Sequence, residues 1–163
     1  LPFINKITDG AVGFGEGDGP KELQAKAFSF SPLVCYEIIF SNKIIAKNSD
    51  PDLIVNLTND SWFGNSIGPY QHLASAQMRA IEYATSVARV ANSGITAFID
   101  PFGRIIDRIE LNKTAILDVK LVKKNNDTIY QKFGNLLLSI IILVVVIILI
   151  FSPKNVSKSS NSN

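Results

Sequence analysis

The sequence predicts an α/β domain with a mixed sheet, followed by one membrane-spanning helix. Short apolar runs alternate with one helical segment from residue 33, a series of further strands follows that helix, and a long uncharged run begins near residue 133. Strands separated by a helix favour parallel pairing, whereas consecutive strands favour antiparallel pairing. We therefore expect a domain at residues 1–130, a transmembrane helix at 133–151 and a polar, basic tail, expected to be disordered, at 152–163.

Charge and cysteine content exclude several classes of protein. The 163 residues carry 16 basic and 14 acidic side chains, and a net charge of +2 is too small and too evenly mixed for a nucleic-acid surface. Cys35 is the only cysteine, so no disulfide can form within the chain. One Cys and one His lack a ligand-spacing motif, and we expect no metal or other cofactor.

The apolar pattern predicts each element in turn. A short strand ends at Cys35, an amphipathic segment runs over 37–46, and the NSDP sequence at 48–51 breaks the chain. A buried strand is predicted at 52–57, a polar loop at 58–69 and a helix at about 70–84. Further strands are predicted at 87–91, 95–99, 104–109 and 115–119, with a proline turn at 100–103. The glycine-rich stretch at 10–20 lacks the Gly-Lys-Ser/Thr of a phosphate loop, which favours a surface loop.

The run at 136–151 contains no charge and, counted from Phe133, reaches roughly the 20 residues that cross a bilayer. A buried strand or core helix is the alternative, but so long a run without a polar face favours a transmembrane helix. The N-terminus lacks the basic and then apolar pattern of a signal peptide, so this helix is interpreted as an anchor. Lys154 and Lys158 favour a cytoplasmic tail with the domain outside, although lysines at 120–132 favour the reverse.

Cys35 is the first candidate for chemistry, because it lies where a strand meets a predicted helix. Such a junction fixes and exposes the side chain, and nearby backbone amides favour the thiolate that attacks substrates. The alternative is that a lone cysteine in an apolar strand is a small buried hydrophobic residue.

Polar and aromatic residues gather after the next strand, at 56–64, where ligands bind in α/β sheets. Trp62 and Phe63 are adjacent aromatics in a predicted loop, which indicates contact with an apolar partner. The sole histidine, His72, invites a Cys-His mechanism, but spacing assigns no residue to orient it. A structural role or a substrate contact is therefore favoured for His72.

Six segments together resemble bacterial apolipoprotein N-acyltransferases. They are LVCYEIIF at 33–40, VNLTNDSWFG at 55–64, GPYQH at 68–72, QMRAIE at 77–82, ANSGI at 91–95 and IDPFGR at 99–104. The resemblance implies a nitrilase-like α-β-β-α sandwich, present here in part, outside the inner membrane. It implies that Cys35 takes an acyl chain from a phospholipid as a thioester and passes it to the N-terminal amine of a diacylglyceryl-cysteine apolipoprotein.

The same resemblance suggests roles for residues near the nucleophile. Glu37 is expected to act with Cys35 in the catalytic group, while Tyr36, Trp62, Phe63 and His72 are expected to contact substrate. The family's general-base Glu and its Lys match positions upstream of Leu1, and residues 4–5 depart from the family's Pro-Phe-Gly-Glu motif. This implies a fragment, inactive alone, whose missing half lies on an upstream chain. A nitrilase-type amidase and a non-catalytic membrane-tethered remnant are the alternatives.

Overall fold

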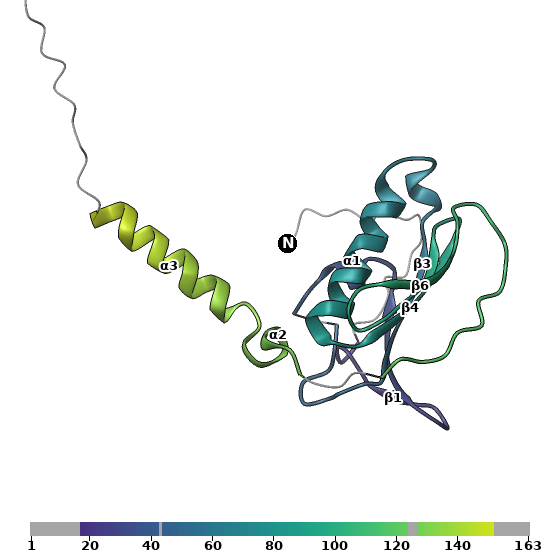
Figure 1. Ribbon diagram of the computed structural model, residues 1–163, viewed down its shortest axis with the longest axis horizontal. Coiled ribbons are helices and arrows are strands. Elements are labelled where there is room, and N and C mark those ends of the chain that lie inside the picture. The colour runs from purple at the N-terminus through teal and green to yellow at the C-terminus, as the bar shows by residue number, and fades with distance from the viewer. Residues whose placement is uncertain (1–16, 43, 124–126, 152–163) are drawn as a thin grey trace, which may run out of the picture.

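A computed structural model describes residues 17–42, 44–123 and 127–151 of the protein. One mixed sheet carries the long helix α1 on one of its faces (Figure 1). The predicted loop at 10–20 is therefore described only from Gly17, and the predicted tail at 152–163 lies outside the described residues.

Six strands form the sheet in the same order as in the sequence. They are β1 (Leu23–Gln24), β2 (Ser29–Val34), β3 (Leu53–Asn59), β4 (Ser86–Asn92), β5 (Thr96–Ile99) and β6 (Ile105–Ile109). The central strands β2, β3 and β4 are parallel, whereas β1, β5 and β6 pair antiparallel with their neighbours. The prediction of an α/β domain with a mixed sheet is confirmed.

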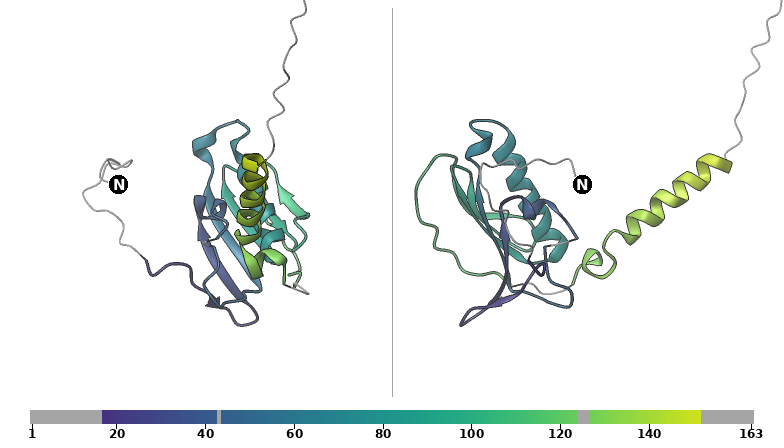
Figure 2. Two further views of the ribbon diagram at one scale, coloured as in Figure 1. Left: turned by 90° about the vertical axis from the view of Figure 1, so that its left-hand side faces the viewer. Right: turned by 180° about the vertical axis from the view of Figure 1, so that it is seen from behind.

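Helix α1 (Gly68–Tyr83) connects β3 to β4 and covers one face of the sheet (Figures 1 and 2). Pro69 in its first turn has the fixed φ that suits a helix start, and the helix ends at Ala84, which has a φ of +45°. Its small apolar stripe packs onto the inward side chains of the strands. The resulting core contains Leu33, Ile38, Ile44, Ile54, Leu73, Ala76, Ala80, Val87, Ile95, Ala97 and Ile99.

The opposite face of the sheet is open at the end where the parallel strands finish. Val34 pairs with Leu57 and Leu57 with Val90, so the three side chains form one row across β2, β3 and β4. They are 65%, 52% and 52% exposed, respectively. Because side chains alternate between the faces of a strand, this apolar row points away from α1. We call it the open row.

Two sequence predictions are wrong. The amphipathic segment at 37–46 is not a long helix: only the five-residue 3-10 helix η1 (Cys35–Ile39) forms, and the chain is extended again at Phe40. The predicted strand at 115–119 has no strand partner, and Ile116 is 93% exposed. Apolar alternation alone does not make a strand, because the strand also needs backbone hydrogen bonds to a partner strand.

The C-terminal part contains α2 (Ile129–Phe133) and α3 (Leu136–Phe151), with Gly134 at a φ of +52° between them. The continuous helix predicted from residue 133 is therefore interrupted. Among the described residues, no helix combines the length and apolar character required to cross a membrane. All side chains of α3 are exposed, and α3 projects away from the domain (Figures 1 and 2).

Candidate active site

Cys35 occupies a sharp turn between β2 and η1. Its φ of +52° lies in the left-handed region, which side chains other than glycine rarely adopt. Such strain persists only where neighbouring contacts hold it, and it is concentrated at functional sites. The side chain is half-buried rather than sealed in the core, so the predicted nucleophile is accessible.

Hydrogen bonds from both sides hold this turn. The Glu37 carboxylate accepts a hydrogen bond of 2.7 Å from the backbone N–H of Val34, which ties the end of β2 to η1. The Asn56 side-chain amide, on β3, donates to the Cys35 carbonyl at 3.2 Å. The two bonds fix the backbone before and after the sulfur-bearing residue.

The sulfur itself contacts the end of β3. The Thr58 hydroxyl lies 3.4 Å from Cys35 Sγ and 3.1 Å from Asp60 Oδ1. A hydroxyl has one hydrogen to donate, so it serves one of these acceptors at a time. Thr58 thus connects the candidate nucleophile to a buried carboxylate.

Behind Thr58 lies a buried polar cluster of Asn56, Asp60, His72 and Arg89, none more than 3% exposed. Arg89 on β4 forms an ion pair with Asp60 Oδ2 and donates to Asn56 Oδ1 at 2.8 Å. His72 Nδ1 on α1 lies 2.9 Å from Asp60 Oδ1. Buried charges need partners of this kind, and the cluster joins β3, β4 and α1 beneath Cys35.

Burial and charge set the protonation of this cluster. Burial lowers the pKa of His72, and the Arg89 cation lowers it further, while Asp60 opposes both effects. Burial also lowers the pKa of Arg89, opposed by the Asp60 charge, but an arginine remains protonated in proteins. The cluster at neutral pH therefore contains a neutral imidazole, with its Nδ1 next to Asp60, beside an Arg–Asp ion pair.

Gly94 permits the close packing around Asp60. A Cβ atom at Gly94 would lie 2.4 Å from Asp60 Oδ2, closer than real contacts allow. Arg89 Nε also donates to the Ile95 carbonyl at 3.3 Å. The loop between β4 and β5 therefore packs directly against the cluster.

Three of the predicted substrate contacts lie together beside Cys35. The Tyr36 ring stacks on His72 with centroids 5.0 Å apart, and Phe63 lies about 6 Å from both rings. A surface pocket of about 160 Å³ opens here. Its lining consists of Tyr36, Ile39, Phe63, Gly68, Gln71, His72 and Ser75. An aromatic pocket next to a thiol suits an apolar substrate group.

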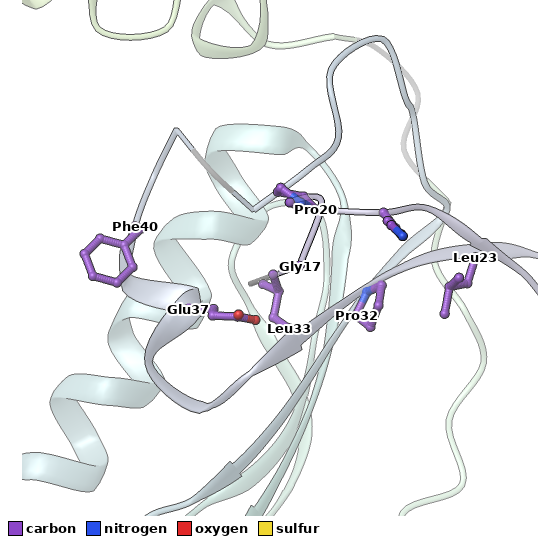
Figure 3. A pocket seen from close by; sticks show the side chains of 9 residues that line it. Gly17, Pro20, Leu23, Pro32, Leu33, Glu37 and Phe40 are labelled. Atoms are coloured by element: carbon purple, nitrogen blue, oxygen red, sulfur yellow. The ribbon is translucent and has the colours of Figure 1, made fainter. Parts of the chain in front are cut away.

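The other two predicted residues lie elsewhere. Trp62, in the 3-10 helix η2 (Ser61–Phe63), is 83% exposed and takes no part in this ring cluster. Glu37 is exposed and faces a second pocket of about 540 Å³, where Figure 3 shows it beside Leu33 and Phe40. Its observed role is to cap the Cys35 turn, and its catalytic role stays a prediction.

Sequence reasoning missed the cluster that supports the nucleophile. Spacing in the sequence assigns no residue to orient His72, and the structure shows that Asp60 is that residue. An aspartate in a polar loop carries no sign of this role, because aspartates are common in turns. The sequence does indicate that Arg89 has a partner, because a charged residue inside an apolar strand is almost never buried without one. Among the described residues, no group of three His, Cys, Asp or Glu side chains is arranged to hold a metal ion.

Comparison with known sequences places these residues in a family. The sequence model of the carbon–nitrogen hydrolases matches residues 8–125, which include every strand and α1. The crystal structure of XC1258 from Xanthomonas campestris, a CN-hydrolase superfamily protein with an arsenic adduct in its active site, has the same fold. The TM-score is 0.50 at 19% identity, over 76% of this chain and 51% of that one.

Apolipoprotein N-acyltransferases are much more similar in sequence. The one from Rickettsia prowazekii is 42% identical over 145 residues, which cover 86% of this chain and 29% of the relative. The one from Bradyrhizobium diazoefficiens is 47% identical over 110 residues, covering 68% of this chain and 20% of the relative. The predicted resemblance is confirmed, and the chain spans less than a third of the length of these relatives.

Proposed function

Because the chain belongs to the carbon–nitrogen hydrolase family, we propose that it is the nucleophile-bearing part of an apolipoprotein N-acyltransferase. The similarity to enzymes of that name supports the proposal. The observation that carries it is the strained, accessible turn at Cys35, with a hydroxyl on its sulfur and a buried ionic cluster behind it. Structural cysteines rarely have such surroundings.

In the proposed reaction, the Cys35 thiolate attacks the ester carbonyl of a phospholipid. An S–C bond forms, the C–O bond breaks, and the lysophospholipid leaves with a proton. The N-terminal amine of a diacylglyceryl-cysteine apolipoprotein then attacks the thioester. An N–C bond forms, the S–C bond breaks, and a proton lost by the amine restores the thiol. Covalent catalysis suits this exchange because the two lipid substrates need not be bound at the same time.

We further propose that the 163-residue chain is inactive by itself. In the described part of the chain, the hydrogen-bond partner of Cys35 Sγ is Thr58, and no lysine or carboxylate bonds the sulfur. Acyl transfer needs a general base and charge stabilisation of the tetrahedral intermediate. The expected sources are the Glu and Lys of the upstream half.

The open row supports docking of that half onto the sheet. Three apolar side chains, Val34, Leu57 and Val90, lie exposed at the strand ends nearest Cys35. A second sheet packed there would bury them and would bring its side chains toward the sulfur. The partial α-β-β-α sandwich would then be complete.

The proposed site of action is the outer surface of the bacterial inner membrane, with α3 as the membrane contact. All sixteen residues of α3 are apolar except Ser139, and all are exposed. Sixteen residues rise about 24 Å, against about 30 Å for a bilayer core, so residues that flank α3 would complete the anchor. A chain that ends at Asn135 should float with vesicles far less than the full chain.

The deciding experiment is a split-protein assay in membranes. The chain is expressed alone and together with the N-terminal part of the Rickettsia prowazekii relative, and phospholipid and diacylated lipopeptide are supplied. We expect an acyl thioester on Cys35 by mass spectrometry only when both parts are present, and none with Cys35→Ser. An adduct on the isolated chain would contradict the inactivity.

Two other outcomes favour the alternatives. Hydrolysis of short soluble amides without acyl transfer would indicate a nitrilase-type amidase. Association with the upstream part without adduct or hydrolysis would indicate a non-catalytic, membrane-tethered remnant.

A further inference from the structure

Thr58 lies between two acceptors whose charges differ through the reaction. Its hydroxyl is 3.4 Å from Cys35 Sγ and 3.1 Å from Asp60 Oδ1, and it is half-buried. Asp60 is already bound by Arg89 and His72, so its carboxylate is fixed and cannot move toward the sulfur. The only freedom in this arrangement is the rotation of the Thr58 hydroxyl.

We propose that Thr58 stabilises the Cys35 thiolate by donating its hydroxyl hydrogen to the sulfur, and turns to Asp60 whenever the sulfur is neutral or acylated. The inference deepens the proposed function, on which it rests, by adding a residue that touches the reacting atom. A hydrogen bond to an anion is about twice as strong as one between neutral groups. The ionised sulfur is therefore an acceptor that competes with the carboxylate, whereas a thiol or thioester sulfur is a weak one.

Asp60 lowers the free-energy cost of turning the Thr58 hydroxyl away from the sulfur. Because the hydroxyl finds a carboxylate oxygen in its second position, it is paired in both states, and no buried donor is ever left unsatisfied. Asp60 is thus a positioning residue, which acts through Thr58. Arg89 balances the Asp60 charge, so Thr58 faces an ion pair rather than a lone anion that would oppose ionisation of the sulfur.

The groups that bear on the ionisation of the sulfur come from four elements. They are Tyr36 and Glu37 on η1, Asp60 between β3 and η2, His72 on α1 and Arg89 on β4. Removing the Thr58 hydroxyl leaves all five side chains in the chain and takes one hydrogen bond from Asp60, which keeps its bonds to Arg89 and His72. A substitution at Thr58 therefore tests the hydroxyl separately from these charges.

The experiment measures alkylation of Cys35 by iodoacetamide as a function of pH, on the full chain in detergent. Only the thiolate reacts, and Cys35 is the sole cysteine, so the rate reports its ionised fraction. We expect Thr58→Val to slow alkylation about tenfold at pH 7 and to move the midpoint of the pH–rate profile up by about one unit. Thr58→Ser keeps the hydroxyl and should match the native chain.

Control variants allow the alkylation experiment to support or to contradict the proposal. Thr96→Val removes a strand hydroxyl that bonds the Ala91 backbone instead, and it should leave the profile unchanged. If Thr58→Val matches the native chain, or if Thr58→Ser is slowed as much as Thr58→Val, the proposal is wrong. If Thr58→Val perturbs folding, Thr58→Ser compared with the native chain still tests the proposal, because a tenfold slower alkylation of the serine variant would contradict it. Alkylation needs no acyl donor or acceptor, so the outcome is independent of the split-protein assay.

Discussion

The two faces of the sheet differ in how far the chain itself completes them. On the face covered by α1, even the charged side chains are paired: Asp60, His72 and Arg89 form one cluster and are almost fully buried. On the opposite face, the open row exposes apolar side chains across three strands. Strand β3 carries residues of both kinds, Asn56 and Leu57, and the nucleophile follows the neighbouring strand β2. The chain therefore packs and pairs the side chains that support Cys35 on one face of the sheet and leaves the open row of the other face exposed.

The largest expected effect is the loss of the Asp60 carboxylate. Asp60→Ala leaves the Arg89 cation buried without its partner, which costs about 3–5 kcal/mol in the free energy of unfolding. The exposed Asp107→Ala, on β6 of the same sheet, should stay within about 0.5 kcal/mol of the native chain. Urea denaturation followed by circular dichroism measures both. Equal losses would mean that the buried cluster does not support the covered face.

The second prediction compares the two faces within one strand. Ile54→Ala opens a cavity under α1 and should cost about 2–5 kcal/mol, because Ile54 is fully buried. Leu57→Ala, three residues on, should cost about 0.5 kcal/mol or less in the isolated chain.

The same strand also tests docking of the upstream half. Leu57→Asp should abolish co-purification with that half while leaving the urea midpoint of the isolated chain nearly unchanged. A large loss of stability from Leu57→Ala would show instead that the chain covers this face by itself.

The difference between the faces also explains what the sequence predicts well. Local periodicity predicts the central strands and α1, because alternation and helical spacing are properties of neighbouring residues. It fails at 115–119, where the pattern suits a strand but the segment pairs with no other strand. It also misses β1, whose two residues are too short to show any period.

In the candidate site too, the sequence predicts what depends on neighbouring residues and misses what depends on tertiary pairing. Cys35, Tyr36, Phe63 and His72 are all identified from the sequence and lie together. The pair of Asp60 with Arg89 joins residues 29 apart, one directly after β3 and one on β4, and the parallel pairing of β3 with β4 brings them together. Tertiary pairing of this kind leaves no local pattern beyond an unexplained charge in an apolar strand.

The third prediction concerns how the free energy of unfolding depends on pH through His72, on the face covered by α1. The pKa of His72 lies below its usual value of 6.5 because of burial and the Arg89 cation. As the pH falls below 6.5, His72 takes up a proton in the unfolded chain but stays neutral in the folded chain. The free energy of unfolding is therefore highest above pH 6.5 and decreases as the pH falls toward the folded pKa of His72. The slope is at most about 1.4 kcal/mol per pH unit.

His72→Asn keeps a donor near Asp60 and should flatten that decline. His72 is the only histidine, but burial raises the pKa of Glu82, which gives a slope of opposite sign. The difference between the native chain and His72→Asn at each pH isolates the histidine. An unchanged decline in the variant would contradict the assignment.

The last prediction separates two adjacent aromatic residues of η2, Trp62 and Phe63. Phe63 packs against Tyr36 and His72, so Phe63→Ala should cost about 1–3 kcal/mol, whereas Trp62 is 83% exposed and Trp62→Ala should cost no more than about 0.5 kcal/mol. An exposed indole that adds nothing to folding indicates a contact outside the chain. In the split-protein assay, Trp62→Ala should lower the acyl adduct on Cys35 without moving the urea midpoint. Phe63→Ala should lower both, and an unchanged adduct with Trp62→Ala would exclude the indole as a lipid contact.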